Sequence, residues 1–344
     1  MVALVFRRVL AVALIAMASP IAVVLPAAPA GAATKLTIGF IPVLGSAQLF
    51  VIDGEGWAKQ ADIELAITRF DSGPAMIQAL ASGKLDLYLA GIGPIMVARG
   101  QGIDVRVVAA AAIEELAVLA RGRLAEILDR TPALPDAVAA FAKAQGRKPK
   151  FATQPPGSVP DTVMRYWLDP VSKVVLADVE ILGIGIDATQ QAFLSGAVDA
   201  AVVREPTLTL IRDRDRKAKL VAAGGQLFPN QPGSVLAALA TSDAAKRDAM
   251  LRFVRLHVRA TEMLQKEPKR AAPHILKALG AGIVPLDVIE RALVSPASRF
   301  VTDPAIIVEA TGKMQDYQIA LGVLKQAVPV AQLFDHESYR RAVE

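Results

Sequence analysis

The chain has 344 residues, enough for about two domains of ordinary size. Hydrophobic residues make up 53% of it and charged residues 21%, so the chain is globular rather than disordered. It carries 38 Lys and Arg against 33 Asp and Glu, and it has no Cys. Disulfide scaffolds, cysteine nucleophiles and thiolate metal sites are therefore excluded. The three His are far apart in sequence, and the interspersed charges form no nucleic-acid-binding patch.

The first 32 residues have the pattern of an export signal. Arg7 and Arg8 precede an apolar run over residues 9–25, and small residues follow up to Ala32. This order predicts a signal peptide that is cleaved near Ala32 and a mature protein that is not embedded in the membrane. A membrane anchor is the alternative. Pro20 interrupts the run, however, and a spanning helix needs about 20 apolar residues.

Strand and helix patterns alternate along the first part of the mature chain. Strands are predicted at residues 35–40, 63–70, 85–90 and 105–112, and helices at residues 48–60, 74–81 and from 91 onward. The near-continuous apolar run at 105–112 is typical of a strand that is covered on both faces. The spacing indicates an α/β fold.

The alternation then restarts, which predicts a second lobe. Strands are predicted at residues 116–120, 150–153, 179–182 and 200–203, and helices at residues 136–144, 160–168 and 188–194. From residue 242 the pattern is mostly helical, with helices expected at 244–265, 269–279, 286–293 and 304–320.

One internal similarity supports two related lobes. Residues 79–86 (ALASGKLD) match residues 192–199 (AFLSGAVD) at four of eight positions. Both segments contain a helix end, a Ser-Gly stop and an Asp just before a strand. A shared glycine at the helix end could also arise in unrelated α/β units.

Glycine and serine are concentrated in the loops that follow the predicted strands. These loops are residues 43–47, 71–74, 91–94 and 154–159. In an open α/β sheet, ligands bind beyond the carboxyl ends of the strands, where helix N-termini favour anions. Each loop alone could be a simple strand–helix turn, and none matches a phosphate-binding motif. Together they predict a ligand-binding edge.

The turn after the last strand of the second lobe carries Arg204 and Glu205. Either residue could contact a ligand or the facing lobe, and Arg204 could bind an anion in a bidentate manner. A solvated ion pair at the strand end is an equal alternative. Ser72 and Asp187 are predicted to be helix N-caps, and Trp57 and Trp167 are predicted to lie in the core.

Short motifs occur along the chain in a specific order: residues 35–40, 54–57, 63–65, 72–75, 80–86, 157–158, 194–200, 204–206, 322–324 and 333–335. With these motifs the sequence resembles periplasmic substrate-binding proteins of the nitrate/sulfonate/taurine ABC-transporter class. The resemblance implies a type II periplasmic-binding-protein fold, with two α/β lobes, a ligand cleft between them and a helical C-terminal region. The implied boundaries are 1–32 for the signal peptide, 33–113 and 208–344 for lobe I, and 114–207 for lobe II.

The resemblance also implies the positions of the cleft contacts. The matching residues are Gly45, Ser46, Ser72, Gly73, Gly93, Gly157, Ser158, Arg204 and Glu205. The family often has an aromatic residue where this chain has Arg204, a departure that changes the polarity of the pocket.

The sequence therefore predicts a monomeric periplasmic protein without catalytic residues, metal or cofactor. It would capture a small anionic solute, similar to a sulfonate, taurine or nitrate, by hinge closure and deliver it to an ABC permease. An enzyme on the same fold, similar to pyrimidine-precursor synthases, is the alternative, which the absence of Cys and the scarcity of His disfavour. A sensor that uses the same clamp is a third possibility.

Overall fold

The computed structural model describes residues 33–280, 282 and 284–344. Residues 33–344 form one compact unit. The expected signal peptide lies outside the described residues.

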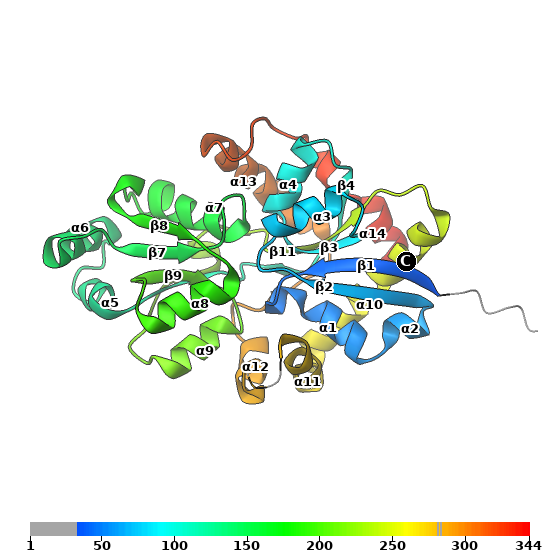
Figure 1. Ribbon diagram of the computed structural model, residues 1–344, viewed down its shortest axis with the longest axis horizontal. Coiled ribbons are helices and arrows are strands. Elements are labelled where there is room, and N and C mark those ends of the chain that lie inside the picture. Colours follow the sequence, from blue (N-terminus) through cyan, green and yellow to red (C-terminus); the bar gives the residue numbers. More distant parts are fainter. Residues whose placement is uncertain (1–32, 281, 283) are drawn as a thin grey trace, which may run out of the picture. The chain divides into compact units, whose positions relative to one another are not determined.

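Two five-stranded sheets organise the chain, and Figure 1 shows them side by side. In the first sheet the order is β2 (Ile63–Arg69), β1 (Thr34–Phe40), β3 (Leu87–Gly91), β11 (Ser234–Leu239) and β4 (Val105–Ala110). β1 pairs in parallel with β2 and β3, whereas β11 is antiparallel to both of its neighbours.

The second sheet repeats this plan. Its order is β8 (Glu180–Gly183), β7 (Lys150–Thr153), β9 (Ala200–Val203), β6 (Ala117–Ala120) and β10 (Lys219–Ala223). β7 is parallel to β8 and β9, and β6 is antiparallel to β9 and β10. Strand order and pairing direction are thus the same in both sheets, so the two lobes share one topology.

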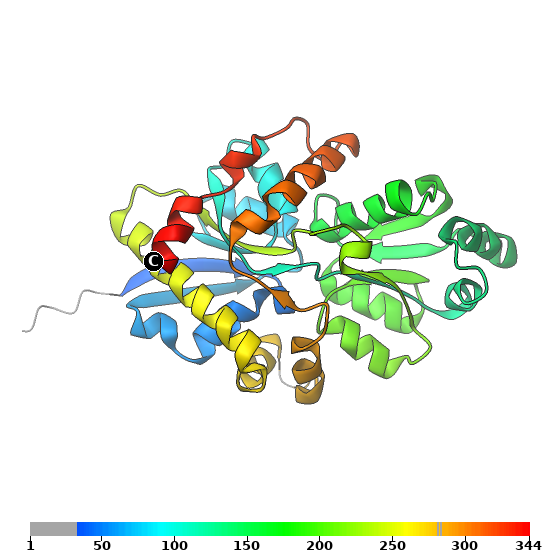
Figure 2. The ribbon, with the colours of Figure 1, turned by 180° about the vertical axis from the view of Figure 1, so that it is seen from behind.

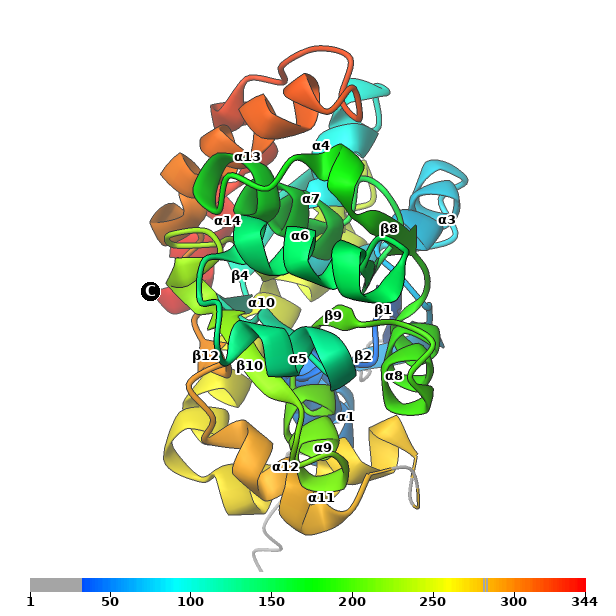
Figure 3. The same cartoon turned by 90° about the vertical axis from the view of Figure 1, so that its left-hand side faces the viewer.

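Helices cover both sheets, and all residues of the central strands β3 and β9 are buried. This burial explains their continuous apolar sequence. Helices of the first lobe are α1 (Ala47–Gly54), α2 (Trp57–Gln60), α3 (Ile77–Ala81) and α4 (Gly93–Gly100). Helices of the second lobe are α5 (Gly122–Leu128), α6 (Leu134–Gln145), α7 (Val159–Tyr166), α8 (Ile186–Ser195) and α9 (Thr207–Arg214). Figure 3 shows α5 and α6 at the outer side of the second lobe.

The C-terminal region is helical, as predicted. Its elements are α10 (Ala244–Lys266), α11 (Pro268–Leu279), α12 (Leu286–Leu293), α13 (Val308–Ala320) and α14 (His336–Val343). α10 packs on α1 and α14 of the first lobe, whereas α12 contacts α9 and α13 contacts α7 of the second lobe. Figure 2 shows α10 and α14 on the side opposite to the view of Figure 1.

The chain crosses between the sheets twice. It leaves the first sheet through β5 (Ala112–Ile113), which pairs with β12 (Arg299–Phe300), and it returns between β10 and β11. The expected end of the second lobe at residue 207 lies before two elements of that lobe. α9 follows this position, and β10 pairs with β6 in the second sheet, so the second lobe extends to Ala223.

The two similar sequence segments form the same structure, a left-handed glycine at a helix end followed by an aspartate that binds a strand. Gly83 and Gly196 both have left-handed backbones, with φ 67° and 79°, which only glycine adopts without strain. The following aspartates then bind β1 in the first lobe and β7, the strand at the equivalent position of the sheet, in the second lobe. A carboxylate oxygen of Asp86 accepts a hydrogen bond from the Thr37 backbone N–H at 2.8 Å. Asp199 does the same with Lys150 at 2.8 Å.

Two sequence predictions of helix starts are wrong. Asp187 is not the N-cap of α8, because Gly185 is already extended and the helix begins at Ile186. Ser72 is not an N-cap either, since Gly73 occupies that position before the turn at Pro74. The burial predictions hold, because Trp57 and Trp167 are each 5% exposed.

His257 is fully buried in α10 and stays neutral there. Its Nε2 lies 2.8 Å from the Ala110 carbonyl oxygen, which can only accept, so Nε2 carries the proton. Burial lowers the pKa of His257 to about 4. The folded-state pKa is thus below the unfolded value of about 6.5. The stability that this site contributes is full above pH 6.5 and is lost as the pH falls towards 4.

We expect about 3 kcal/mol of unfolding free energy to be lost through this site between pH 7 and pH 4. His257→Gln keeps a donor for the Ala110 carbonyl oxygen but does not titrate. Urea unfolding of both proteins across this pH range measures the difference. Equal pH slopes for the two proteins would contradict the assignment.

Candidate functional site

Loops at the carboxyl ends of the strands of both lobes meet at one cleft. The Leu44 N–H donates to the Glu205 carbonyl oxygen at 3.0 Å, and the Ile186 N–H donates to the Asp71 carbonyl oxygen at 3.3 Å. Arg69 of β2 also forms an ion pair with Asp187 of α8. The predicted ligand-binding edges of the two lobes therefore face each other.

Four glycines on the first lobe allow close packing at this cleft. A Cβ on Gly93 would lie 2.6 Å from the Gly157 carbonyl oxygen, and one on Gly91 would lie 2.7 Å from Val159 Cγ2. Both neighbours belong to the second lobe. A Cβ on Gly45 would overlap the Glu115 carboxylate, and one on Gly73 would lie 2.6 Å from the Tyr88 hydroxyl. The space that these four glycines leave free is thus filled by neighbouring protein atoms.

The predicted serines are buried at the same edges. Ser158 is the N-cap of α7, and its hydroxyl accepts a hydrogen bond from the Asp161 N–H at 3.3 Å. Gly157 precedes it with φ 84°, a conformation that favours glycine. Ser46 and Ser72 are 0% and 4% exposed. Among the described residues, the Ser46 hydroxyl has no hydrogen-bond partner.

Arg204 is the most unusual residue of the cleft. Its side chain is 3% exposed, and its Nε lies 3.1 Å from Glu115 Oε1, whose carboxylate also accepts from the Ser234 hydroxyl at 2.9 Å. None of the three guanidinium nitrogens makes a hydrogen bond of good geometry with a described residue. Arg204 and Glu115 therefore form a buried charge pair, in which Arg204 keeps unused N–H donors. The alternative that the sequence left open, a solvated ion pair at the strand end, is wrong.

Glu115 is fully buried between the two sheets. Burial raises the pKa of this carboxyl, while the charge of Arg204 and the hydrogen bond from Ser234 oppose the rise. Tyr88 lies nearby and donates to the Gly91 carbonyl oxygen at 2.7 Å. Burial also raises the pKa of Tyr88, so the phenol stays neutral.

The Glu205 side chain lines a different cavity, of about 570 Å³, between α9 and α12. Its carboxylate accepts hydrogen bonds from the Thr209 N–H at 3.1 Å and from the Thr209 hydroxyl at 2.9 Å, so it caps the start of α9. Burial raises its pKa. At the cleft, Glu205 contributes its backbone carbonyl oxygen, which accepts a hydrogen bond from the Leu44 N–H.

Two cavities lie in the cleft. An inner cavity of about 20 Å³ is lined by Val43, Gln154, Pro160, Ile186, Thr189, Val202, Val203, Arg204 and Thr207. An outer cavity of about 260 Å³ is lined by Pro42, Arg69, Ile186, Asp187, Gln190, Gln191, Pro206, Thr207, Leu279 and Val284. Ile186 and Thr207 line both. Of the nine predicted site residues, Arg204 alone lines one of these two cavities.

The sequence reasoning missed several polar side chains of the inner cavity. Gln154 is in a loop that was identified, but only its glycine and serine were singled out. Thr189 and Thr207 lie just inside helices, where no local motif marks them. Their place after strand ends of the second lobe was the available signal.

Within the described residues, no group of three or more His, Asp or Glu side chains is arranged to hold a metal ion. A search of the same residues finds no helix long and apolar enough to span a bilayer.

Comparisons with known proteins agree with this geometry. Residues 30–279 match the model of the NMT1-like family. A Bacillus subtilis (strain 168) protein, provisionally named an aliphatic sulfonates-binding protein, is 25% identical over 304 residues, which cover 86% of this chain and 85% of that protein.

Solved structures share the fold at low sequence identity. The nitrate-binding protein NrtA of Synechocystis PCC 6803 has a TM-score of 0.76 at 16% identity, covering 90% of this chain and 88% of that one. The alkanesulfonate-binding protein SsuA of Xanthomonas axonopodis pv. citri, bound to MOPS, has a TM-score of 0.69 at 20% identity, covering 88% and 98%. These names describe binding proteins and not enzymes. The chain has the two-lobe type II periplasmic-binding-protein fold and belongs to the NMT1-like family.

Proposed function

We propose that this chain is the solute-binding component of an ABC importer. It captures a small organic or inorganic anion between its lobes and delivers it to a permease. The protein acts as a monomer in the periplasm after cleavage near Ala32, without a catalytic step. The nine residues predicted from the sequence form the two edges of the cleft, and Arg204 is the one that contacts the solute.

The unused donors of Arg204 carry this proposal. A buried guanidinium without hydrogen-bond acceptors is costly, and Glu115 compensates its charge without filling its donor positions. A planar anion such as a carboxylate, nitrate or sulfonate edge fits these N–H groups in a bidentate manner.

The two cavities suggest how the solute lies. Its charged group occupies the inner cavity, beside Arg204, Gln154 and Thr189. A larger solute extends into the outer cavity, where Leu279 and Val284 offer apolar surface. The inner cavity alone has room for about one water molecule, so the lobes separate to admit an anion and then close around it less tightly than in this structure.

Lobe separation is compatible with the contacts between the lobes. Arg69 and Asp187, which line the outer cavity, form an ion pair whose side chains are 38% and 61% exposed. Exposed pairs of this kind contribute at most about 1 kcal/mol. Two connecting segments join the lobes, which allows a hinge motion. Opening the hinge breaks the backbone hydrogen bonds of Leu44 and Ile186 and those from the Gln318 amide of α13 to the second lobe, and a bound anion stabilises the closed arrangement.

The first test is a thermal-shift and calorimetric titration with nitrate, methanesulfonate, taurine and octane-1-sulfonate. We expect at least one of them to stabilise the protein, by about 2.7 kcal/mol at a concentration of one hundred times Kd. Arg204→Gln should weaken that binding about tenfold or more, since a charged hydrogen bond is lost. Arg123→Gln on the exposed face of α5 is the control. Unchanged binding by Arg204→Gln would disprove the role of this residue.

Glu115 should oppose anion binding, because its carboxylate lies beside the same guanidinium. Its pKa is raised, and an anion on Arg204 raises it further, so binding should tighten as the pH is lowered. Glu115→Gln should bind anions about tenfold more tightly and lose this pH dependence. Calorimetry at several pH values checks both effects, with Glu114→Gln as the neighbouring control. Weaker anion binding by Glu115→Gln at every pH would contradict this role.

Gly93 should control how closely the lobes approach. In Gly93→Ala the new methyl group would press on the Gly157 carbonyl oxygen, which costs about 1–3 kcal/mol or separates the lobes. Small-angle scattering should then show a larger radius of gyration. Gly312→Ala in α13 is the matched control, because a Cβ there meets only Val330 at 3.7 Å. Equal radii for the two variants would refute a closure contact at Gly93.

A further inference from the structure

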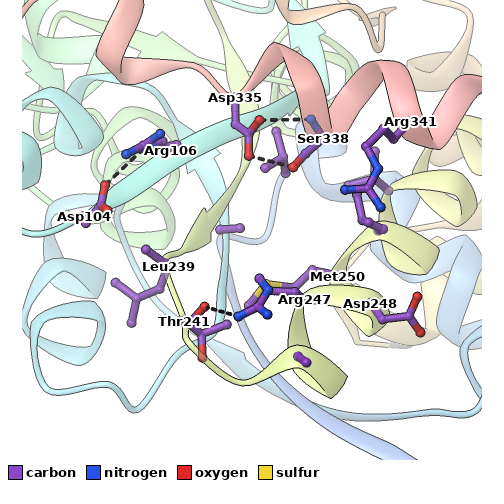
Figure 4. Close-up of a pocket in the computed structure, with 16 residues that line it drawn as sticks. Asp104, Arg106, Leu239, Thr241, Arg247, Asp248, Met250, Asp335, Ser338 and Arg341 are labelled. Carbon is purple, nitrogen blue, oxygen red and sulfur yellow. Dashed lines mark hydrogen bonds and ion pairs between the residues drawn. The ribbon is translucent and has the colours of Figure 1, made fainter.

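A separate cavity of about 440 Å³ lies in the first lobe, away from the cleft (Figure 4). β4 and the end of β11 form its floor, and α10 and α14 form its sides. Its lining shares no residue with the two cleft cavities. Its volume is in the range of sites that bind small organic molecules.

The floor of this cavity is apolar. Val108 of β4 and Met250 and Val254 of α10 are 4%, 8% and 1% exposed. Ala238 and Leu239 at the end of β11 extend the same surface. Ala238 and Leu239 are partly exposed and offer the apolar surface that a ligand can still cover, so the cavity favours a molecule with an apolar body.

The carboxylates around the cavity are already engaged. Both oxygens of Asp335 accept from Ser338, at 2.9 Å from its N–H and 2.6 Å from its hydroxyl. Asp104 pairs with Arg99 and Arg106, and Asp248 pairs with Arg252. Figure 4 shows Asp248 directed away from the cavity.

Two arginines, by contrast, retain free donors. Arg247 of α10 donates one N–H to the Thr241 carbonyl oxygen at 3.0 Å. In Arg341 of α14 the backbone oxygen accepts a hydrogen bond from Arg255, and the guanidinium makes none with the described residues. Neither guanidinium forms an ion pair with a carboxylate among the described residues. Figure 4 shows the Arg247 side chain turned towards Thr241 and the Arg341 side chain on α14. Positive charge is therefore available at the rim, above the apolar floor.

We propose that this cavity is a second ligand site, which binds an amphipathic organic anion with a short hydrocarbon body. Arg247 and Arg341 at the rim provide positive charge for the anionic group, and the planar N–H groups of either arginine match a carboxylate or sulfonate. The hydrocarbon body lies against Ala238, Leu239 and the edge of Met250. This site does not depend on the cleft, so a ligand can occupy it whether or not a solute is bound beside Arg204.

Methyl NMR with octanoate as the probe tests this site directly. Labelling the methionine ε-methyl groups of the mature protein gives few signals, and Met250→Leu assigns the one in the cavity. We expect octanoate to shift the Met250 signal in a saturable way at concentrations up to about 1 mM. Met164, which lies in the second lobe, should not shift, and Arg204→Gln should not change the result.

Charge variants complete the test. The double variant Arg247→Gln/Arg341→Gln should weaken octanoate binding at Met250 about tenfold or more. Arg340→Gln, which alters the neighbouring arginine of α14 that pairs with Glu337, is the matched control and should bind normally. Octan-1-ol, with no negative charge, should bind far more weakly. The proposal is overturned if the Met250 signal does not respond to octanoate, or if the double variant and octan-1-ol behave like the wild type with octanoate.

Discussion

The buried pair of Arg204 and Glu115 is the interaction on which the cleft depends. Arg204 ends a strand of the second lobe, Glu115 lies on one connecting segment, and Ser234, which binds the carboxylate, begins a strand of the first lobe. One charge pair thus joins both lobes and a connection between them. The small residues around it follow from this arrangement, because a Cβ on Gly45 or Gly233 would press on the Glu115 carboxylate. A buried pair is a weak source of stability but a strong constraint on what can lie beside it.

The repeated topology explains why the two edges meet. Each lobe fixes one strand at the same position of its sheet, β1 or β7, with an aspartate that follows a left-handed glycine, Asp86 after Gly83 and Asp199 after Gly196. The strand ends of the two sheets are thereby placed in equivalent ways, and their loops form the two sides of one cleft. Short loops on rigid strands are suited to holding a small solute at a fixed position.

The two kinds of cavity differ in the way their charge is organised. In the cleft, Arg204 is compensated by Glu115 and enclosed by both lobes, so access depends on their separation. On the first lobe, Arg247 and Arg341 stand at an open rim above an apolar floor. Enclosure strengthens the electrostatic contacts in the cleft, whereas the arginines of the open cavity are exposed to solvent, which weakens theirs.

The alternation of strands and helices, the two-lobe plan and the helical C-terminal region could be predicted from the sequence, because they follow from local periodicity and from glycine positions. The loops of the cleft could be predicted in the same way. The sequence did not distinguish glycines that make room for neighbouring protein atoms from residues that line a cavity. It also could not pair Arg204 with Glu115, which is 89 positions away. These roles required the folded structure, since burial and charge compensation arise from segments that are distant in sequence and meet only after folding.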